Sequence, residues 1–292
     1  MKYEKGVVLA GGTGSRLYPT TKVINKHFLN VYDKPMIYYS LSILMLLKIR
    51  KISIVIDEPS LLLAKKLLGN GDELGIEIDY EIQDSPLGLS DAINKTILNN
   101  EDKKFLVVLG DNFLYGRDFY NNFYNLIDID KCNIFFQKVK NPEEFAVIEL
   151  DSKKQLKNII EKPDTYISDL AVTGIYSFDE NFFGYFQNTR ISERNEFEIT
   201  DILKSYLDEK NLNPIYLGRG MTWMDMGSYE SLVNCSNFVR TIQERQNILV
   251  NSPHEIAFRN NWIAKKDIKK LFEKNPNSVY FINLFNNIDS IY

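Results

Sequence analysis

The sequence predicts an α/β fold, in which a mostly parallel central sheet is flanked by helices and extended by added mixed strands and a C-terminal helical region. Short apolar runs alternate with helical patterns through about residue 125, as in right-handed strand–helix–strand crossovers. From Asn133 onward, strand-like runs follow one another with few helices between them, which indicates mixed or antiparallel strands. No internal repeat or low-complexity linker interrupts the chain.

The N-terminal half contains four predicted strands. Gly6–Ala10 is a short apolar run that ends in glycines, which is typical of a central parallel strand buried on both faces. Asp33–Pro35 predicts a helix start, because proline is tolerated in the first turn. Ile76–Ile82 alternates apolar and acidic residues, so we expect one buried and one solvated face. The other predicted strands are Ile52–Ile56 and Phe105–Leu109, and the other helices are a buried core helix from Pro35 to Ile49, a stretch ending near Leu68, and Ser90–Leu98.

The C-terminal half continues with strands and then helices. The predicted strands are Phe135–Val139, Ala146–Leu150, Leu156–Ile160 and Ala171–Phe178. Helical patterns cover Glu196–Leu207 and Tyr229–Arg245, and a charged, helical tail follows Ile263. We therefore expect one main domain over residues 1–240 and a helical appendage over 241–292, which could serve as an interface or regulatory region.

The composition favours a small-molecule partner and a reducing compartment. Lysines and arginines are scattered among acidic residues and the net charge is -4, which argues against nucleic-acid binding. Cys132 and Cys235 are far apart and lack metal-ligand spacing. The apolar segment at 35–49 is too short to cross a bilayer, and no signal peptide is evident, so we expect no membrane partner and a cytoplasmic location.

A glycine-rich loop, Gly11-Gly12-Thr13-Gly14-Ser15-Arg16, follows the first predicted strand. Loops at this place in open α/β sheets bind ligands. The dinucleotide fingerprint fails because Leu17 stands at its third glycine position, and no Gly-Lys-Ser/Thr of a P-loop is present. Small residues allow backbone N–H groups to approach phosphate, and Arg16, Lys22 and Lys26 add positive charge. The loop therefore predicts a phosphate site, although a tight surface turn would share each feature taken singly.

The loop and several later motifs resemble the signature of bacterial glucose-1-phosphate thymidylyltransferases, which are sugar nucleotidyltransferases. The resemblance covers essentially the whole chain. It rests on Leu9–Leu17, Val31–Tyr39, Gly110–Asn112, Glu161–Pro163, Val172–Gly174, Glu196–Asp201, Leu217–Gly220, Trp223–Asp225, Ile242–Gln246 and Glu255–Arg259. It implies a Rossmann-like nucleotidyltransferase fold of the GT-A-like type, with the catalytic domain at 1–240.

The resemblance implies a reaction in which a sugar-1-phosphate oxygen attacks the α-phosphorus of a nucleoside triphosphate in line and expels pyrophosphate. The leading substrates are dTTP and glucose 1-phosphate. Because the nucleophile is already anionic, positioning and charge neutralisation suffice, and Mg²⁺ is the expected cofactor. In the family, the metal is held by the residues that correspond to Asp111 and Asp225. The nucleotide is bound by those that correspond to Gly11, Gly12, Gly14, Arg16, Lys26, Gln83 and Gly88. The sugar phosphate is bound by those that correspond to Asn112, Ala146, Glu161, Lys162, Val172 and Arg194. Arg16, Lys26 and Lys162 are the expected catalytic cations.

The sequence departs from the family pattern beside this expected site. His27 replaces a glutamine near the nucleotide sugar, and Phe145-Ala146 replaces Tyr-Gly near the sugar phosphate. Leu87 replaces an acidic residue beside the base contacts, although Gln83 and Gly88 are kept. No expected metal or phosphate residue is lost, so we expect retained chemistry with a substrate choice that could differ.

Three alternatives remain open at this point. The same chemistry could use another sugar phosphate, such as an amino-deoxy sugar, or UTP or CTP. The chain could be a catalytically silent regulator that binds nucleotide sugars, although the joint presence of Arg16, Lys26, Asp111, Lys162 and Asp225 weighs against this. An NAD-dependent oxidoreductase is disfavoured by the failed fingerprint. The resemblance also implies a homotetramer with a feedback site in the C-terminal helical region at a subunit interface.

Overall fold

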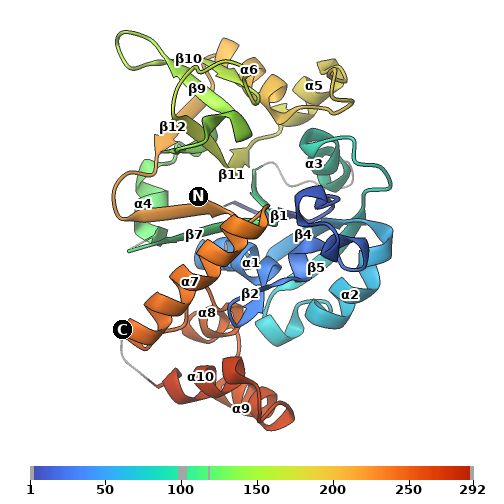
Figure 1. Cartoon of the computed structure of the whole chain (residues 1–292), viewed down its shortest axis with the longest axis vertical. Coiled ribbons are helices and arrows are strands. Elements are labelled where there is room, and N and C mark those ends of the chain that lie inside the picture. Colours follow the sequence, from blue (N-terminus) through green and yellow to red (C-terminus); the bar gives the residue numbers. More distant parts are fainter. Residues whose placement is uncertain (1–2, 98–103, 118, 290–292) are drawn as a thin grey trace.

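The computed structural model, which describes residues 3–97, 104–117 and 119–289, is built around one large mixed sheet (Figure 1). The sheet has the strand order β10-β9-β11-β6-β1-β4-β5, and β8 pairs with β11 and with β12. Its strands are β1 (Lys5–Leu9), β4 (Lys51–Ile56), β5 (Glu77–Ile82), β6 (Phe105–Leu109), β8 (Cys132–Lys138), β9 (Val147–Leu150), β10 (Leu156–Ile160), β11 (Leu170–Phe178) and β12 (Leu212–Tyr216).

The first half of the sheet is parallel and the second half is mixed, as the sequence predicts. β1 pairs in parallel with β4 and β6, and β4 pairs in parallel with β5. β11 is antiparallel to β6, β8 and β9, whereas β12 is parallel to β8. Two small sheets lie outside it: β7 (Asn112–Gly116) pairs with β13 (Met221–Asp225), and β2 (Asn30–Val31) pairs with β3 (Lys34–Pro35).

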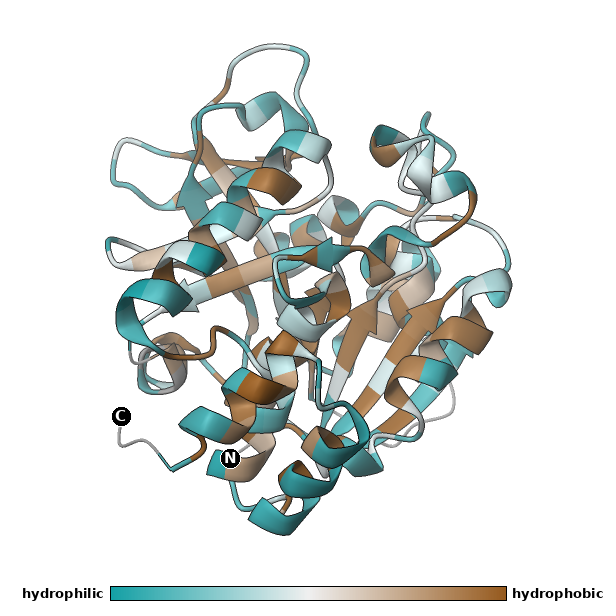
Figure 2. Ribbon diagram, turned by 60° about the horizontal axis from the view of Figure 1, so that its bottom comes forward, coloured by the Kyte–Doolittle hydropathy of each residue, from teal (hydrophilic) through white to brown (hydrophobic). Residues whose placement is uncertain are grey.

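Helices cover both faces of the sheet, which Figure 2 shows as a brown, apolar interior behind helices with teal outer faces. Val8 belongs to a cluster with α1, whereas its neighbour Val7 belongs to a cluster with α3, α5 and α6. Successive strand residues point to opposite faces, so β1 is buried on both. The helices are α1 (Met36–Leu46), α2 (Glu58–Leu68), α3 (Leu89–Ile97), α4 (Phe119–Leu126), α5 (Asn181–Asn188), α6 (Ile199–Asp208), α7 (Tyr229–Gln246), α8 (Pro253–Arg259), α9 (Lys265–Lys274) and α10 (Val279–Asn287).

Most predicted elements are confirmed within a few residues. The buried core helix begins at Met36, directly after Pro35, and residues 36–45 are all buried. The helix predicted to begin at Glu196 is wrong for its first three residues, because Glu198 is extended and α6 starts at Ile199. Leu98, predicted as the end of a helix, lies outside the described residues. The elements that were not predicted are β2, β3, β7, β12, β13, α4, α5 and α8.

The C-terminal helices pack on the main sheet layer through α1. Ile256 and Ala257 of α8 share a buried cluster with α1, and Gln243 of α7 donates to Asp33 Oδ2 at 2.9 Å. Helices α9 and α10 lie at the opposite end of the molecule from β9 and β10 (Figure 1). The predicted domain boundary at residue 240 falls within α7, which runs unbroken from Tyr229 to Gln246. No helix in the described residues is long and apolar enough to span a membrane.

Candidate active site

The glycine-rich loop follows the carboxyl end of β1, a central strand of the sheet. Gly14 has φ of +62° in the left-handed region, and a Cβ there would lie 2.8 Å from Thr21 Cγ2. The Thr21 hydroxyl donates to the Gly14 carbonyl at 2.9 Å, which closes the turn. Only glycine accommodates this backbone without strain. The short helical turn Ser15–Leu17 that follows carries Arg16 away from the strand end.

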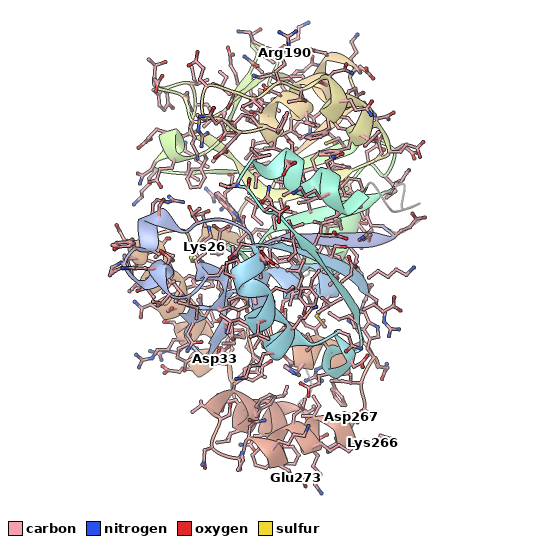
Figure 3. All side chains as sticks on the ribbon, turned by 90° about the vertical axis from the view of Figure 1, so that its right-hand side faces the viewer. Lys26, Asp33, Arg190, Lys266, Asp267 and Glu273 are labelled. Carbon is pink, nitrogen blue, oxygen red and sulfur yellow. The ribbon has the colours of Figure 1, made fainter. Side chains whose placement is uncertain are left out.

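Lys26 and Asp111 meet beneath this loop. Lys26 Nζ lies 2.5 Å from Asp111 Oδ2, and the two side chains are 14% and 9% exposed. Burial would by itself raise the pKa of Asp111, but the adjacent Lys26 ammonium lowers it to about 2. Asp111 is therefore a carboxylate at neutral pH. Figure 3 shows Lys26 in the middle of the molecule, between Arg190 at one end and Glu273 at the other.

The second predicted metal ligand, Asp225, reaches the same place from another strand. The β7–β13 ladder pairs Asp225 with Asn112, and Met226 N donates to the Asp111 carbonyl at 2.8 Å. Burial, followed by repulsion from Asp111, raises the pKa of Asp225 to about 6. Two carboxylates that repel each other in a buried site favour a cation between or beside them.

The carboxylate pair suits a hard cation that keeps other ligands. Among residues 3–97, 104–117 and 119–289, no three His, Cys, Asp or Glu side chains are grouped closely enough to hold a metal. Magnesium is commonly held by one or two carboxylates, with substrate phosphates and water completing its shell. Asp111 and Asp225 fit that donor set.

Arg16 lies next to Asp225 on the outer side of the pair. Arg16 Nη2 is 3.6 Å from Asp225 Oδ1, and Arg16 Nη1 is 3.0 Å from Glu144 Oε2. Gly227 permits this approach, because a Cβ there would lie 2.5 Å from Arg16 Nη2. Gly227 N also donates to Asp225 Oδ1 at 2.9 Å. Four expected site charges, Arg16, Lys26, Asp111 and Asp225, thus come together.

A cavity of about 180 Å³ adjoins Lys26 and Asp111 and gathers the predicted nucleotide residues other than Gly14 and Arg16. Gln83 Nε2 donates to the Gly88 carbonyl at 3.2 Å and to Asp91 Oδ2 at 3.0 Å, so its amide is held in place. The lining consists of Leu9, Gly11, Gly12, Lys26, His27, Val55, Gln83, Pro86, Gly88, Leu89, Ala92, Leu109, Asp111 and Glu196. Apolar walls with a few fixed polar groups are typical of a small-molecule site.

His27 enters this cavity as a neutral ring. Its Nδ1 is 2.7 Å from Asn25 Oδ1, and Asn25 Nδ2 donates to the Ala10 carbonyl and to Asp57 Oδ1. Because Asn25 Oδ1 can only accept, the Nδ1 atom must carry the proton. Burial and the neighbouring Lys26 charge lower the pKa of His27 to about 3. The ring therefore presents no charge at neutral pH.

Arg194, expected at the sugar phosphate, lies among three glutamates, one of which, Glu196, also lines the cavity. Arg194 is 3.4 Å from Glu161 Oε1, 3.5 Å from Glu198 Oε1 and 3.9 Å from Glu196 Oε2. Burial, with the neighbouring Glu198 charge, raises the pKa of Glu161. Lys162 adopts φ of +37°, on the left-handed side of the backbone map.

A backbone contact joins Ala146 and Val172, whereas Asn112 is held through its side chain. Val172 N donates to the Ala146 carbonyl at 2.8 Å. Asn112 is buried, and its Oδ1 accepts from Gly174 N and Trp223 Nε1 while its Nδ2 donates to Asp111 Oδ1 at 3.1 Å. In this structure the Asn112 side chain therefore orients Asp111.

Sequence reasoning missed four residues that position this site. Asn25 fixes the His27 ring, and Trp223 fixes Asn112. Glu144 and Glu198 contact the expected phosphate-binding arginines Arg16 and Arg194. Trp223 stands two residues before Asp225 in a recognised motif, which was a usable signal. No signal in the sequence pointed to Glu144, because it is 128 residues from Arg16.

Comparisons with known proteins show the family to which the chain is similar. A family model described as nucleotidyl transferase matches residues 5–242. The chain is 40% identical over 286 residues to the glucose-1-phosphate thymidylyltransferase of Neisseria meningitidis serogroup A / serotype 4A, covering 96% of this chain and 99% of the relative. It is 38% identical over 267 residues to that of Mycobacterium tuberculosis, covering 90% and 92%.

Solved structures show the same fold. A Bacillus anthracis structure described as a glucose-1-phosphate thymidylyltransferase in complex with a sucrose superposes with a TM-score of 0.74 and 35% identity, covering 81% of this chain and 95% of that one. A UDP-glucose pyrophosphorylase complexed with UDP-glucose has a TM-score of 0.72 at 23% identity, covering 82% and 99%. At that identity the second likeness concerns the fold alone.

Proposed function

This chain belongs to the glucose-1-phosphate thymidylyltransferase family of nucleotidyl transferases, and on that basis we propose that it converts dTTP and α-D-glucose 1-phosphate into dTDP-glucose and pyrophosphate. The observation that carries the proposal is the meeting of Lys26, Asp111, Asp225 and Arg16 beside the cavity lined by Gly11, Gln83 and Gly88. Cations and carboxylates so close together suit a substrate of several phosphates with a bound metal.

The base of the nucleotide would lie in the cavity, and its phosphates would extend toward the glycine-rich loop. Gln83 and Gly88 would meet the base, and the backbone of Gly11, Gly12 and Gly14 would approach the phosphates. Lys26 would contact the α-phosphate and Arg16 the remaining phosphates. Each of these cations lies beside a carboxylate of the site. Magnesium, held by Asp111 and Asp225, would supply neutralisation of phosphate charge.

The acceptor would bind next to Arg194 and the carboxylates around it. Lys162 and Arg194 would hold the sugar phosphate, which must approach another anion and therefore needs cations of its own. Glu161 would accept hydrogen bonds from sugar hydroxyls, together with polar groups at Asn112, Ala146 and Val172. The acceptor oxygen is anionic, so attack on the α-phosphorus needs no protein base. The protein would therefore contribute positioning and charge neutralisation.

One observation favours a second acceptor, an amino-deoxy sugar 1-phosphate. Three carboxylates, Glu161, Glu196 and Glu198, lie within 4 Å of the single Arg194 guanidinium. Their excess negative charge would suit an ammonium group on the sugar.

A substrate grid tests both acceptors and the choice of base. Pyrophosphate release is measured with magnesium for dTTP, UTP and CTP, each with glucose 1-phosphate and with an amino-deoxy sugar 1-phosphate. The proposal expects the largest kcat/KM for dTTP with glucose 1-phosphate. A larger value for another pair would replace the substrates, and release with no pair despite dTTP binding would favour a silent regulator.

A cytoplasmic homotetramer with feedback regulation completes the proposal. A cavity of about 670 Å³ lined by residues of α1, β7 and α8, including Leu114, Tyr115 and Glu255, gives an effector a place to bind near the C-terminal helices. Light scattering measures the assembly, and a single-chain mass in solution would contradict it.

A further inference from the structure

Glu144 lies at the end of a short helical turn, Pro142–Glu144, on the connection between β8 and β9. Both oxygens of its carboxylate are engaged. Oε2 accepts from Arg16 Nη1 at 3.0 Å, and Oε1 accepts from Asn141 Nδ2 at 3.4 Å. The amide contact and the guanidinium contact together restrict the direction of the carboxylate.

The residues after Glu144 lead directly to the acceptor side of the site. The Phe145 ring packs edge-on against Trp223 at 5.3 Å between centroids, and its carbonyl accepts from Lys162 N at 3.1 Å. The Ala146 carbonyl accepts from Val172 N. Glu144 therefore stands on a segment that is anchored at the expected sugar-phosphate residues and reaches back to the expected triphosphate residue.

Arg16 depends on this contact for its direction. Its guanidinium lies between two carboxylates, Glu144 at 3.0 Å and Asp225 at 3.6 Å, and its side chain is 52% exposed. A half-exposed arginine has many rotamers of similar energy. If the contact with Glu144 were lost, Asp225 would be its remaining carboxylate partner, and the guanidinium would turn toward the oxygen that a magnesium ion needs.

We propose that Glu144 is a positioning residue for nucleotide binding: it holds Arg16 on the outer side of Asp225, so that Arg16 faces the triphosphate and Asp225 stays available to the metal. This inference rests on the proposed function, because it assigns Arg16 to the triphosphate. As a contribution to stability the exposed pair is minor. Its effect is on the KM for the triphosphate and on the magnesium requirement.

The test compares Glu144→Gln with Glu143→Gln in steady-state pyrophosphate release. Glu143 is the adjacent, exposed glutamate, so the two variants lose the same charge from the same turn. Glu144→Gln is expected to raise the KM for dTTP about fivefold and to raise the magnesium concentration at half-maximal rate. The KM for glucose 1-phosphate and the midpoint of thermal unfolding should match those of Glu143→Gln. Glu144→Asp, which keeps the charge, should recover part of the loss.

Each other outcome overturns the inference. Equal kinetics in the two variants would mean that Glu144 does not direct Arg16. A lower KM for dTTP in Glu144→Gln would make Glu144 a competitor for Arg16. Equal losses for both substrates would make it a general structural residue. Failure of the proposed function is distinguishable, because the unmutated protein would then release no pyrophosphate.

Discussion

Lys26 Nζ and Asp111 Oδ2 lie 2.5 Å apart in a site that is almost closed to solvent. The pair joins the turn after the glycine-rich loop to the end of β6, so the cation and the carboxylate neutralise each other until substrate arrives. Asp225 stands beside them, and burial, followed by repulsion from Asp111, raises its pKa to about 6.

Replacing either carboxylate should stop turnover while leaving the protein folded. Asp111→Asn and Asp225→Asn remove the expected oxygen ligands, and we expect kcat to fall by about a hundredfold or more. Asp111→Asn also leaves Lys26 without its buried partner, at a cost of about 1–3 kcal/mol in the free energy of unfolding. Steady-state rates and urea unfolding measure the two effects. Asp84→Asn, an exposed aspartate, is the control, and unaltered kcat in either site variant would remove that residue from the site.

Arg194→Ala should weaken binding of the acceptor alone. Loss of a guanidinium that holds a phosphate is expected to raise the KM for the sugar 1-phosphate about tenfold or more, with the KM for dTTP unchanged. Arg190→Ala removes an exposed arginine on the same connection and should change neither value. An equal rise in both KM values for Arg194→Ala would contradict a role confined to the acceptor.

His27→Gln should keep turnover and shift nucleotide preference at most. The pKa of His27 is lowered to about 3 by burial, so the ring is neutral throughout the working range and transfers no proton. Accordingly, the profile of kcat/KM between pH 5.5 and 8 should have the same shape in this variant as in the unmutated protein. Complete inactivation would show that the ring does more than fill the cavity and accept a hydrogen bond.

Acid should destabilise the fold through its second histidine. Burial lowers the pKa of His254 to about 4, whereas an unfolded histidine titrates near 6.5. Between these values the unfolded chain binds the proton first, so the free energy of unfolding falls as pH decreases from about 6.5 to 4, by up to about 1.4 kcal/mol per pH unit. The stability contributed by the neutral His254 ring is thus fully present above about pH 6.5.

Chemical denaturation across this pH range measures the effect. His254→Asn retains a polar atom opposite Tyr280, whose hydroxyl lies 2.9 Å from His254 Nδ1, and should lose this histidine's share of the slope. An identical slope in the variant would assign the acid sensitivity to other groups.

The parallel half of the fold was predictable because its signals are local. The buried run at β1, its glycines and the alternation at β5 each occupy a few consecutive residues. The β7–β13 pair was not, because Met221–Asp225 is half-buried along its length and its partner strand lies more than 100 residues earlier. Non-local pairing of strands that lack period-two alternation leaves no trace in either segment.

The same difference between local and non-local signals explains which parts of the site could be predicted. The expected nucleotide residues, apart from Gly14 and Arg16, do line one cavity. Gly11 and Gly12 follow β1, and Gln83 and Gly88 follow β5, whose carboxyl ends lie at the same edge of the parallel sheet. Their supporting contacts, Glu144 to Arg16 and Trp223 to Asn112, join segments more than 100 residues apart. The His27 tautomer depends on Asn25 being fixed by Asp57, which sequence spacing cannot convey.

The most direct test of nucleotidyl transfer is the stoichiometry of products from dTTP and glucose 1-phosphate with magnesium. Chromatography separates dTDP-glucose, dTMP and dTDP, and a coupled assay counts pyrophosphate in the same sample. We expect one dTDP-glucose for each pyrophosphate, with no dTMP, because attack comes from the sugar phosphate and not from water. Pyrophosphate accompanied by dTMP, or no dTDP-glucose at any concentration of the two substrates, would contradict the proposed activity.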